Sequence, residues 1–240
     1  MTIQESLDPL GTAIAEYYNK KKDEKVLIHS ENFDDDEVSV SYFFRTEKDF
    51  STIETSALNL CKGKILDVGA GAGCHSLFLQ KKGMDITALE ISKLAVNTMK
   101  EMKITQIIEQ NFYELENIRF DTLLFLMNGS GIIETIDNIS SFFKHARTIL
   151  NDDGQIIMDS SDLKYLYENE DGSFDINIAD KYYGEIRFAM TYKSVKGRWF
   201  DWLYIDFDTL QFYAHENNFT CELAKKGDYY DYLAVLKPIK

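Results

Sequence analysis

The feature that most constrains this fold is an apolar strand that runs directly into alternating glycines. Residues 64–68 are expected to form a buried strand with Asp67 near its end. Three glycines follow at every second position: Gly69, Gly71 and Gly73. A helix is then expected over residues 74–82. Because glycine lets a ligand approach the backbone closely, and the first N–H groups of the helix face that ligand, this turn is expected to bind one.

Strands and helices alternate through the middle of the chain. Further apolar strands are expected at residues 85–89, 105–108, 120–127 and 155–158. Helices are expected at residues 92–102, with Ser92 as the N-cap, and at 139–150, where residues 151–154 should end the helix. This alternation predicts an α/β fold, in which βαβ units form a parallel sheet with helices on both faces.

The two ends of the chain follow other patterns. In the N-terminal part we expect helices at residues 12–22 and 47–60 and extended segments at 26–28 and 38–44. Near the C-terminus, two β-type segments flank a turn with Gly197 and predict a hairpin, over residues 185–193 and 198–206. A helix at 208–216 and strands at 219–224 and 230–236 should follow.

Composition argues against several classes of partner. The 240 residues include 40 acidic and 26 basic side chains, which gives a formal net charge of −14. Nucleic-acid binding depends on clustered Lys and Arg, so neither nucleic acid nor an anionic membrane is expected as a partner. The longest apolar run, residues 123–127, is far shorter than a membrane span. A small molecule is the expected partner.

The cysteines also limit the possibilities. Their number is odd and their spacing wide: Cys61, Cys74 and Cys221. Neither a zinc ribbon nor a disulfide framework fits this spacing, so we expect no metal site. Reduced thiols and a polar N-terminal segment lead us to expect a cytoplasmic protein, while the oligomeric state is left open.

Two ligand classes compete for the glycine turn. A dinucleotide site needs a third glycine three positions after the second, and Cys74 stands at that position. An acidic side chain at the position of Asp67 would repel a pyrophosphate but would suit a ligand with an ammonium group. The turn therefore favours S-adenosylmethionine over NAD.

Residues 66–73, Leu-Asp-Val-Gly-Ala-Gly-Ala-Gly, resemble the first motif of class I S-adenosylmethionine-dependent methyltransferases. The resemblance implies a Rossmann-like, doubly wound, seven-stranded sheet with a C-terminal antiparallel strand. To this we add an N-terminal helix and cap segment over residues 1–46. The methyltransferase domain would then cover residues 47–240 and carry an inserted β-hairpin within a β-rich insertion at about 161–206.

The same resemblance implies roles for residues around the cofactor. Asp67 would support the amino-acid end of S-adenosylmethionine, and the three glycines would lie along its methionine and ribose. Glu90, at the end of the second strand, would accept hydrogen bonds from the ribose hydroxyls. Where the family has an aspartate near the adenine, this chain has Asn111 followed by Phe112. Met127 and Asn128 complete the expected cofactor side.

The substrate side is expected at the carboxyl ends of the next two strands. Asp159, Asp162 and His75 are candidates for moving a proton, and none of them stands out. Arg45, Asp159, Trp199 and Trp202 are the expected substrate residues. The aromatic insertion would cover the acceptor, although its alternation also fits aromatic side chains that pack in a core.

Three hypotheses follow from these patterns. The first is an enzyme that uses S-adenosylmethionine to methylate a small molecule; the chain also resembles a bacterial branch of methyltransferases without an assigned substrate. The second is a Rossmann-type NAD(P)-dependent oxidoreductase. The third is a non-catalytic module that only binds S-adenosylmethionine, which the sequence does not separate from the first because the glycine motif indicates binding rather than chemistry.

Overall fold

The structure is a computed structural model that describes residues 3–31, 33–169, 171–176 and 181–240. Its larger sheet, called the main sheet here, has seven strands in the order β11-β12-β7-β6-β3-β4-β5. Their bounds are β3 (Lys64–Val68), β4 (Asp85–Glu90), β5 (Ile107–Glu109), β6 (Phe120–Phe125), β7 (Leu150–Ser161), β11 (Phe219–Lys226) and β12 (Asp231–Pro238). Strands β3 to β7 pair in parallel, whereas β12 is antiparallel to both its neighbours. The predicted seven-stranded, Rossmann-like sheet with an antiparallel C-terminal strand is confirmed.

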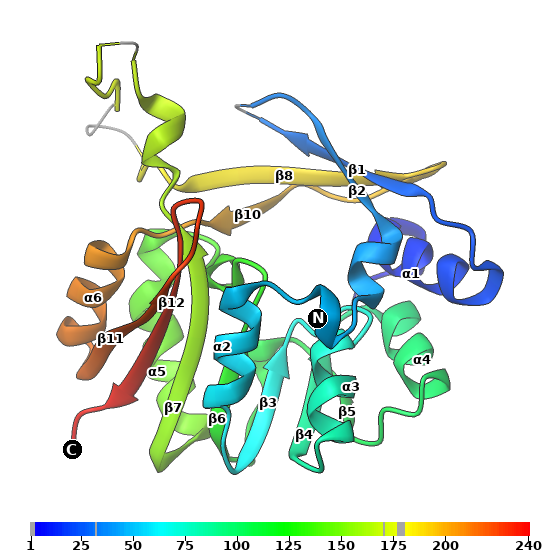
Figure 1. The fold of residues 1–240 in the computed structure, drawn as a ribbon, viewed down its shortest axis with the longest axis horizontal. Coiled ribbons are helices and arrows are strands. Elements are labelled where there is room, and N and C mark those ends of the chain that lie inside the picture. Colours follow the sequence, from blue (N-terminus) through cyan, green and yellow to red (C-terminus); the bar gives the residue numbers. More distant parts are fainter. Residues whose placement is uncertain (1–2, 32, 170, 177–180) are drawn as a thin grey trace.

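Helices cover both faces of the main sheet (Figure 1). They are α2 (Thr52–Leu60), α3 (Cys74–Lys81), α4 (Lys93–Glu101), α5 (Ile139–Ile149) and α6 (Phe207–Glu216). Neighbouring strand residues point to opposite faces. Ile65 therefore packs with α2 and α3, whereas Leu66 belongs to the core beneath α5 and α6. A sheet buried on both faces in this way explains why its strands are apolar almost throughout.

A second sheet, called the cover sheet here, joins the two ends of the chain. It consists of β1 (Lys25–Ser30), β2 (Asp36–Ser39), β8 (Glu185–Tyr192), β9 (Val195–Lys196) and β10 (Phe200–Leu203). All its pairings are antiparallel, and Ile28 of β1 lies opposite Met190 of β8. The predicted hairpin is confirmed as β8 to β10. Figure 1 shows β8 and β10 lying across the end of the main sheet toward which β3 points.

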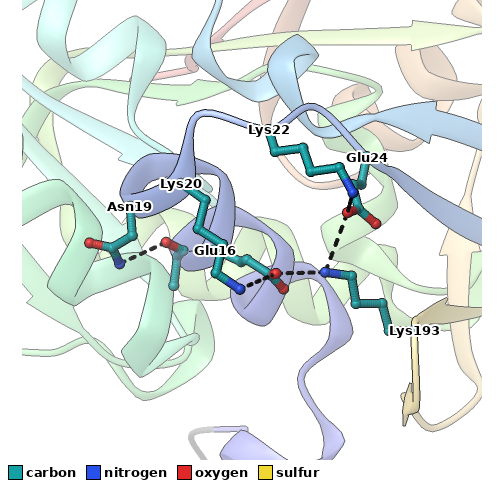
Figure 2. A network of polar contacts seen from close by, with 7 residues as sticks. Glu16, Asn19, Lys20, Lys22, Glu24 and Lys193 are labelled. Atoms are coloured by element: carbon teal, nitrogen blue, oxygen red, sulfur yellow. Dashed lines mark hydrogen bonds and ion pairs between the residues drawn. The ribbon is translucent and has the colours of Figure 1, made fainter.

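The N-terminal helix α1 (Pro9–Lys20) packs beside β8 and α4. Figure 2 shows how its C-terminal turn is tied to the turn after β8: Lys193 Nζ lies 2.6 Å from Glu16 Oε1 and 3.5 Å from Glu24 Oε1. The hydrogen bonds from Lys193 and Lys20 hold the pKa of Glu16 down at about 2. These ion pairs lie at the surface and link the turn after β8 to two neighbouring N-terminal segments, α1 and the residue before β1.

Several predicted boundaries are wrong; the helix expected at residues 47–60, for example, begins only at Thr52. Residues 40–44 form a 3₁₀ turn, η2 (Val40–Phe44), instead of continuing the extended segment. Residues 151–154 do not separate helix from strand, because β7 already begins at Leu150. Leu150 is 2% exposed within the core and pairs with Phe120 before the register shifts, so tertiary burial draws this polar stretch into the strand.

The boundary expected at residue 46 stays a prediction. Part of the expected insertion, residues 170 and 177–180, lies outside the described residues. Among the residues that the structure does describe, no helix combines the length and apolarity that crossing a membrane requires.

Candidate functional site

The glycine loop, residues 69–73, joins β3 to α3 in a left-handed conformation. The φ angles of Gly69, Gly71 and Gly73 are 73°, 57° and 81°. A Cβ at Gly71 would meet nothing within 4 Å, and one at Gly69 would meet only Ile132 Cδ1, at 3.7 Å. A Cβ at Gly73 would overlap Ile104 and lie 2.8 Å from Met99 Sδ. Gly73 therefore serves packing, whereas the first two glycines leave open space beside the backbone.

Hydrogen bonds tie this loop to the end of β4. The N–H groups of Gly69 and Ala70 both donate to Leu89 O, at 2.9 and 3.1 Å. The Gly71 N–H donates to Glu90 Oε2 at 2.8 Å. The structure thus brings the predicted glycine loop and Glu90 into direct contact.

Glu90 is almost fully buried, and the backbone around it holds its carboxylate in place. Its Oε1 accepts hydrogen bonds from the N–H groups of Ile91, at 2.8 Å, and Ser92, at 2.9 Å. Burial raises the pKa of this carboxyl group, while the backbone hydrogen bonds oppose the rise. Three donors from two loops therefore fix one carboxylate beside the open part of the glycine loop.

Asp67 lies near the end of β3, just before the glycine loop, and is only 3% exposed. Its Oδ2 accepts a hydrogen bond from Ser76 Oγ of α3 at 2.7 Å. Burial raises the pKa of Asp67, with the nearby His75 and the Ser76 hydrogen bonds acting in the opposite direction. The side chain joins β3 to α3, and its predicted contact with the amino-acid end of a cofactor stays a prediction.

His75 belongs to a buried ion cluster with Glu54 and Arg45. His75 Nε2 lies 2.7 Å from Glu54 Oε1, and Arg45 Nη2 donates to the same oxygen. All three side chains are no more than 7% exposed. Within the described part of the chain, Arg45 Nε is buried and has no hydrogen-bond partner. The cluster connects the segment after η2 to α2 and to the start of α3.

The charges of this cluster are stabilised by one another. Burial alone would lower the pKa of His75, but hydrogen bonds with Cys74 and Glu54 raise it to about 10. Burial would likewise raise the pKa of Glu54, yet the hydrogen bonds from His75, Ser51 and Arg45 lower it to about 2. At neutral pH His75 is therefore a cation and has no free lone pair with which to accept a proton.

Glu54 was not among the residues expected at the site. Ser51 and Glu54 form a capping box at the start of α2, with the Ser51 N–H donating to Glu54 Oε2 at 2.8 Å. The Ser-x-x-Glu spacing is visible in the sequence and predicts such a cap. The second role of this carboxylate, holding Arg45 and His75, depends on tertiary contacts for which the sequence gives no local signal.

The carboxyl ends of β6 and β7 lie side by side, because the two strands pair in parallel. Met127 and Asn128 both have positive φ angles, 66° and 55°. Asp159 Oδ1 accepts from the Gly129 N–H at 2.9 Å, and Asn128 Oδ1 accepts from Ser161 Oγ at 2.8 Å. Burial raises the pKa of Asp159 to about 6, against the hydrogen bonds from Gly129 and Asn128. Asp159 is therefore held as a fixed carboxylate whose pKa lies close to neutrality.

The remaining candidates lie in different surroundings. Asn111 Oδ1 accepts from the Tyr113 N–H at 2.9 Å and caps a short 3₁₀ turn. Phe112 is 4% exposed and packs among Phe125 and Phe142 in the core beneath α5. Asp162 accepts hydrogen bonds from Tyr183 OH, at 2.7 Å, and from the Lys164 N–H, at 2.8 Å.

The two tryptophans of the insertion differ in their placement. The Trp202 ring lies directly on Gly131, where any Cβ would overlap it, in the turn that follows β6. Trp199 is 47% exposed, with the Arg187 guanidinium 6.0 Å from its ring centre. Of the two tryptophans, Trp202 is thus the one that contacts residues at the end of the main sheet.

Among the described residues, no three His, Cys, Asp or Glu side chains gather as a metal site would require.

Comparisons with known proteins agree with this geometry. The family described as tellurite resistance protein TehB matches residues 38–145. A solved S-adenosylmethionine-dependent methyltransferase from Bacteroides fragilis, in complex with S-adenosyl-L-homocysteine, is 46% identical and has a TM-score of 0.94. The match covers 100% of this chain and 98% of that one.

More distant structures share the fold. An S-adenosylmethionine-dependent methyltransferase from Clostridium acetobutylicum is 14% identical, with a TM-score of 0.56 over 80% of this chain and 94% of that one. The CcbJ methyltransferase from Streptomyces caelestis is 13% identical, with a TM-score of 0.59 over 78% and 94%. A search of curated proteins gave no match.

Proposed function

The chain belongs to the class I S-adenosylmethionine-dependent methyltransferases, and on that premise we propose that its acceptor is a small molecule held between the glycine loop and the cover sheet. S-adenosylmethionine is the methyl donor, since the related B. fragilis protein holds S-adenosyl-L-homocysteine. Neither an NAD(P)-dependent oxidoreductase nor a purely binding module is favoured by this relationship. We also propose a cytoplasmic location, which the three free thiols support.

The residues of the site fit this cofactor. The loop leaves open space at Gly69 and Gly71 beside exposed backbone. Glu90 presents a fixed carboxylate next to that space, and a carboxylate accepts the two hydrogen bonds that vicinal ribose hydroxyls offer. Met127 and Asn128 follow β6, which pairs with β3 on the side opposite to β4. We assign these residues, with Asp67 and Asn111, to the cofactor side.

When bound, S-adenosylmethionine supplies an electrophilic methyl group on a positively charged sulfur. The protein then has to align the acceptor atom with that methyl group and exclude water. The cover sheet is the observation that carries the proposal of a small acceptor. Ser130 Oγ donates to Leu203 O at 2.7 Å and the Ile205 N–H donates to Ser160 Oγ at 2.9 Å, so β10 is fastened to the ends of β6 and β7.

We propose that Asp159 accepts the proton when the acceptor atom arrives protonated. Its carboxylate is fixed by the Gly129 N–H, and burial raises its pKa to about 6, which leaves it mostly ionised at neutral pH. His75, which is a cation there, would instead contribute positive charge to the site through the buried ion cluster. Asp162 already accepts hydrogen bonds from Tyr183 OH and the Lys164 N–H, so we assign it a structural role beneath the cover sheet.

The test is transfer of radiolabelled methyl groups from S-adenosylmethionine to panels of small amines, phenols and thiols, with DNA, RNA and a protein extract as competitors. We expect label in small molecules. Label found only in nucleic acid or protein would contradict the proposal.

Once an acceptor is known, Asp159→Asn should lower kcat at least about tenfold and leave the Kd for S-adenosylhomocysteine unchanged. In the wild type, kcat should rise with pH through about 6, as Asp159 loses its proton. Trp202→Ala should raise the KM for the acceptor, whereas Trp199→Ala serves as the exposed control. Equal effects of the two tryptophan changes would argue against an acceptor under β10.

A further inference from the structure

The N-terminal helix α1 lies outside the stretch that matches the TehB family, yet it packs directly on the cofactor side of the site. Ile14 of α1 forms a small buried core with Ala72 of the glycine loop and Ala95 of α4. All three are no more than 1% exposed. The helix therefore touches both segments that surround Glu90.

A polar contact fixes the start of the same helix. Asp8 is the N-cap of α1, and its Oδ1 accepts from the Gly11 N–H at 2.7 Å. Its Oδ2 accepts from Ser92 Oγ at 2.5 Å, a bond between residues 84 positions apart in the sequence. Asp8 and Ser92 are 3% and 5% exposed, so this bond is shielded from water.

Ser92 connects this contact to Glu90. Its N–H donates to Glu90 Oε1, and its Oγ accepts from the Ala95 N–H at 3.1 Å, as the N-cap of α4. A second tie from the N-terminal segment reaches the neighbouring residue, since the Ile3 N–H donates to Ile91 O at 3.3 Å. The residues whose N–H groups hold the Glu90 carboxylate are thus themselves held by the N-terminal segment.

Gly11 shows how closely the two helices approach. A Cβ at this position would overlap both Asp8 Oδ2 and Ser92 Oγ and would lie 2.7 Å from Asp8 Cγ. Its φ is not in the left-handed region, so only space requires a glycine here. Alanine would be the better helix former in isolation.

We infer that Asp8 is a positioning residue for the cofactor site: by holding Ser92 it fixes the Glu90 carboxylate, so that cofactor affinity depends on the docking of α1. The inference rests on the assignment of Glu90 to the cofactor in the proposed function. Because coupling between two sites is reciprocal, bound cofactor must in turn stabilise the docked helix.

The test compares variants that separate the cap from the bond to Ser92. Asp8→Ser keeps an N-cap oxygen for α1 but is too short to reach Ser92, and should weaken S-adenosylhomocysteine binding about tenfold by calorimetry. Asp8→Asn keeps the cap and can still bond Ser92 Oγ, and should restore most of the affinity. Gly11→Ala should weaken binding as Asp8→Ser does, despite its better helix propensity.

Glu16→Gln is the matched control, because it breaks the ion pairs of α1 with Lys193 and Lys20 without approaching Glu90 (Figure 2). It should change the Kd less than twofold. In the wild type and in Glu16→Gln, S-adenosylhomocysteine should slow hydrogen exchange of the α1 amides. In Asp8→Ser, S-adenosylhomocysteine should no longer slow hydrogen exchange of the α1 amides. A variant that only weakened the N-cap of α1 would still show the slowing.

The outcomes separate the inference from its premise. If Glu90→Gln leaves the Kd unchanged, the assignment of Glu90 fails and the inference fails with it. If Glu90→Gln weakens binding but Asp8→Ser and Gly11→Ala do not, only the inference is overturned. Methyl transfer to a small acceptor is measured separately and is not decided by either result.

Discussion

The main sheet and the cover sheet are assembled from the chain in different ways. The five parallel strands of the main sheet come from one continuous stretch, with apolar cores on both faces. The cover sheet pairs strands from opposite ends of the chain, and His29 and Thr191, 162 positions apart, share a 3.0 Å contact across it. Much of what fastens it is polar: ion pairs at Lys193 and hydrogen bonds at Ser130 and Ser160.

This difference indicates which of the two sheets is rigid and which can open. Elements with large buried apolar cores open only with global unfolding, whereas elements held by a smaller core and surface contacts open locally. A methyltransferase needs a rigid cofactor-binding site and a covering segment that opens to admit the acceptor. We therefore expect the cover sheet to exchange its amides faster than β3, β4 and β6.

The largest expected loss of stability is for a substitution in the core of the main sheet. Phe142 is fully buried beneath the sheet, among Phe112, Phe125 and Phe143. Phe142→Ala should lower the free energy of unfolding by about 4 kcal/mol through lost burial and a cavity. Urea denaturation measures this, with the exposed Phe212→Ala as the control. A loss below about 1 kcal/mol would contradict the contrast between the sheets.

The next effect is at the junction between the two regions, where Arg45 from the N-terminal segment meets α2 and α3. Glu54→Gln leaves two buried cations without their carboxylate and should cost about 3 kcal/mol. The control is Glu47→Gln, which removes an exposed carboxylate 3.4 Å from Lys82. Similar losses for both variants would show that burial of the cluster contributes nothing.

The stability of this junction also depends on pH in a defined direction. The folded pKa of Glu54, about 2, lies below its ordinary value of 4.5, so its contribution is present above pH 4.5 and is lost as the pH falls toward 2. The folded pKa of His75, about 10, lies above 6.5, so its contribution is present below pH 6.5 and is lost as the pH rises toward 10. The Tm difference between wild type and Glu54→Gln should therefore be largest between about pH 4.5 and 6.5, and a flat difference would contradict the assigned charges.

A smaller effect separates two glycines of the same loop. Gly73→Ala should cost about 2 kcal/mol of stability, because its φ is left-handed and its Cβ would meet Met99 and Ile104. Gly71→Ala should lower the free energy of unfolding by only about 1 kcal/mol, because a Cβ there meets no neighbouring atom. That Cβ would enter the open space beside the loop. Relative to its stability loss, Gly71→Ala should therefore weaken S-adenosylhomocysteine binding more than Gly73→Ala does. Thermal unfolding and calorimetry on both variants test this order.

The smallest effect is at the surface of the cover sheet. Lys193→Ala removes the ion pairs with Glu16 and Glu24 in Figure 2 and should cost less than about 1 kcal/mol. The cost should shrink further at 1 M salt, where such pairs are screened. The exposed Lys144→Ala serves as the control. A larger cost that is independent of salt would show that the cover sheet depends on this contact more than its exposure implies.

The parts of the fold that follow from local pattern could be predicted. The apolar strand before Gly69 and the N-cap at Ser92 depend on residues close in sequence, and both are present. The antiparallel last strand, which the family resemblance implied, is also present. Residues 40–44 show the limit, since Val38, Val40 and Tyr42 alternate with serines as in a strand, yet a 3₁₀ turn begins at Val40, which is buried beside Val26 and Tyr192.

The candidate site divides in the same way. The glycine loop and Glu90 were expected and are in contact, because successive parallel strands end at the same edge of a sheet. The partners that set charge at the site were not expected: Glu54 beside His75, and Asp8 beside Ser92. These contacts join positions 21 and 84 residues apart, and no spacing rule connects such residues before the chain folds.

By itself, the sequence determined the class of this protein: a strand, an acidic residue and alternating glycines specify a cofactor turn through backbone geometry that only local residues control. The tertiary structure alone decided that hydrogen bonds raise the pKa of His75 to about 10, that burial raises the pKa of Asp159 to about 6, and that a sheet built from both ends of the chain lies across the end of the main sheet. The reason is physical: protonation and enclosure depend on burial and on distant partners, which exist only once the chain has packed.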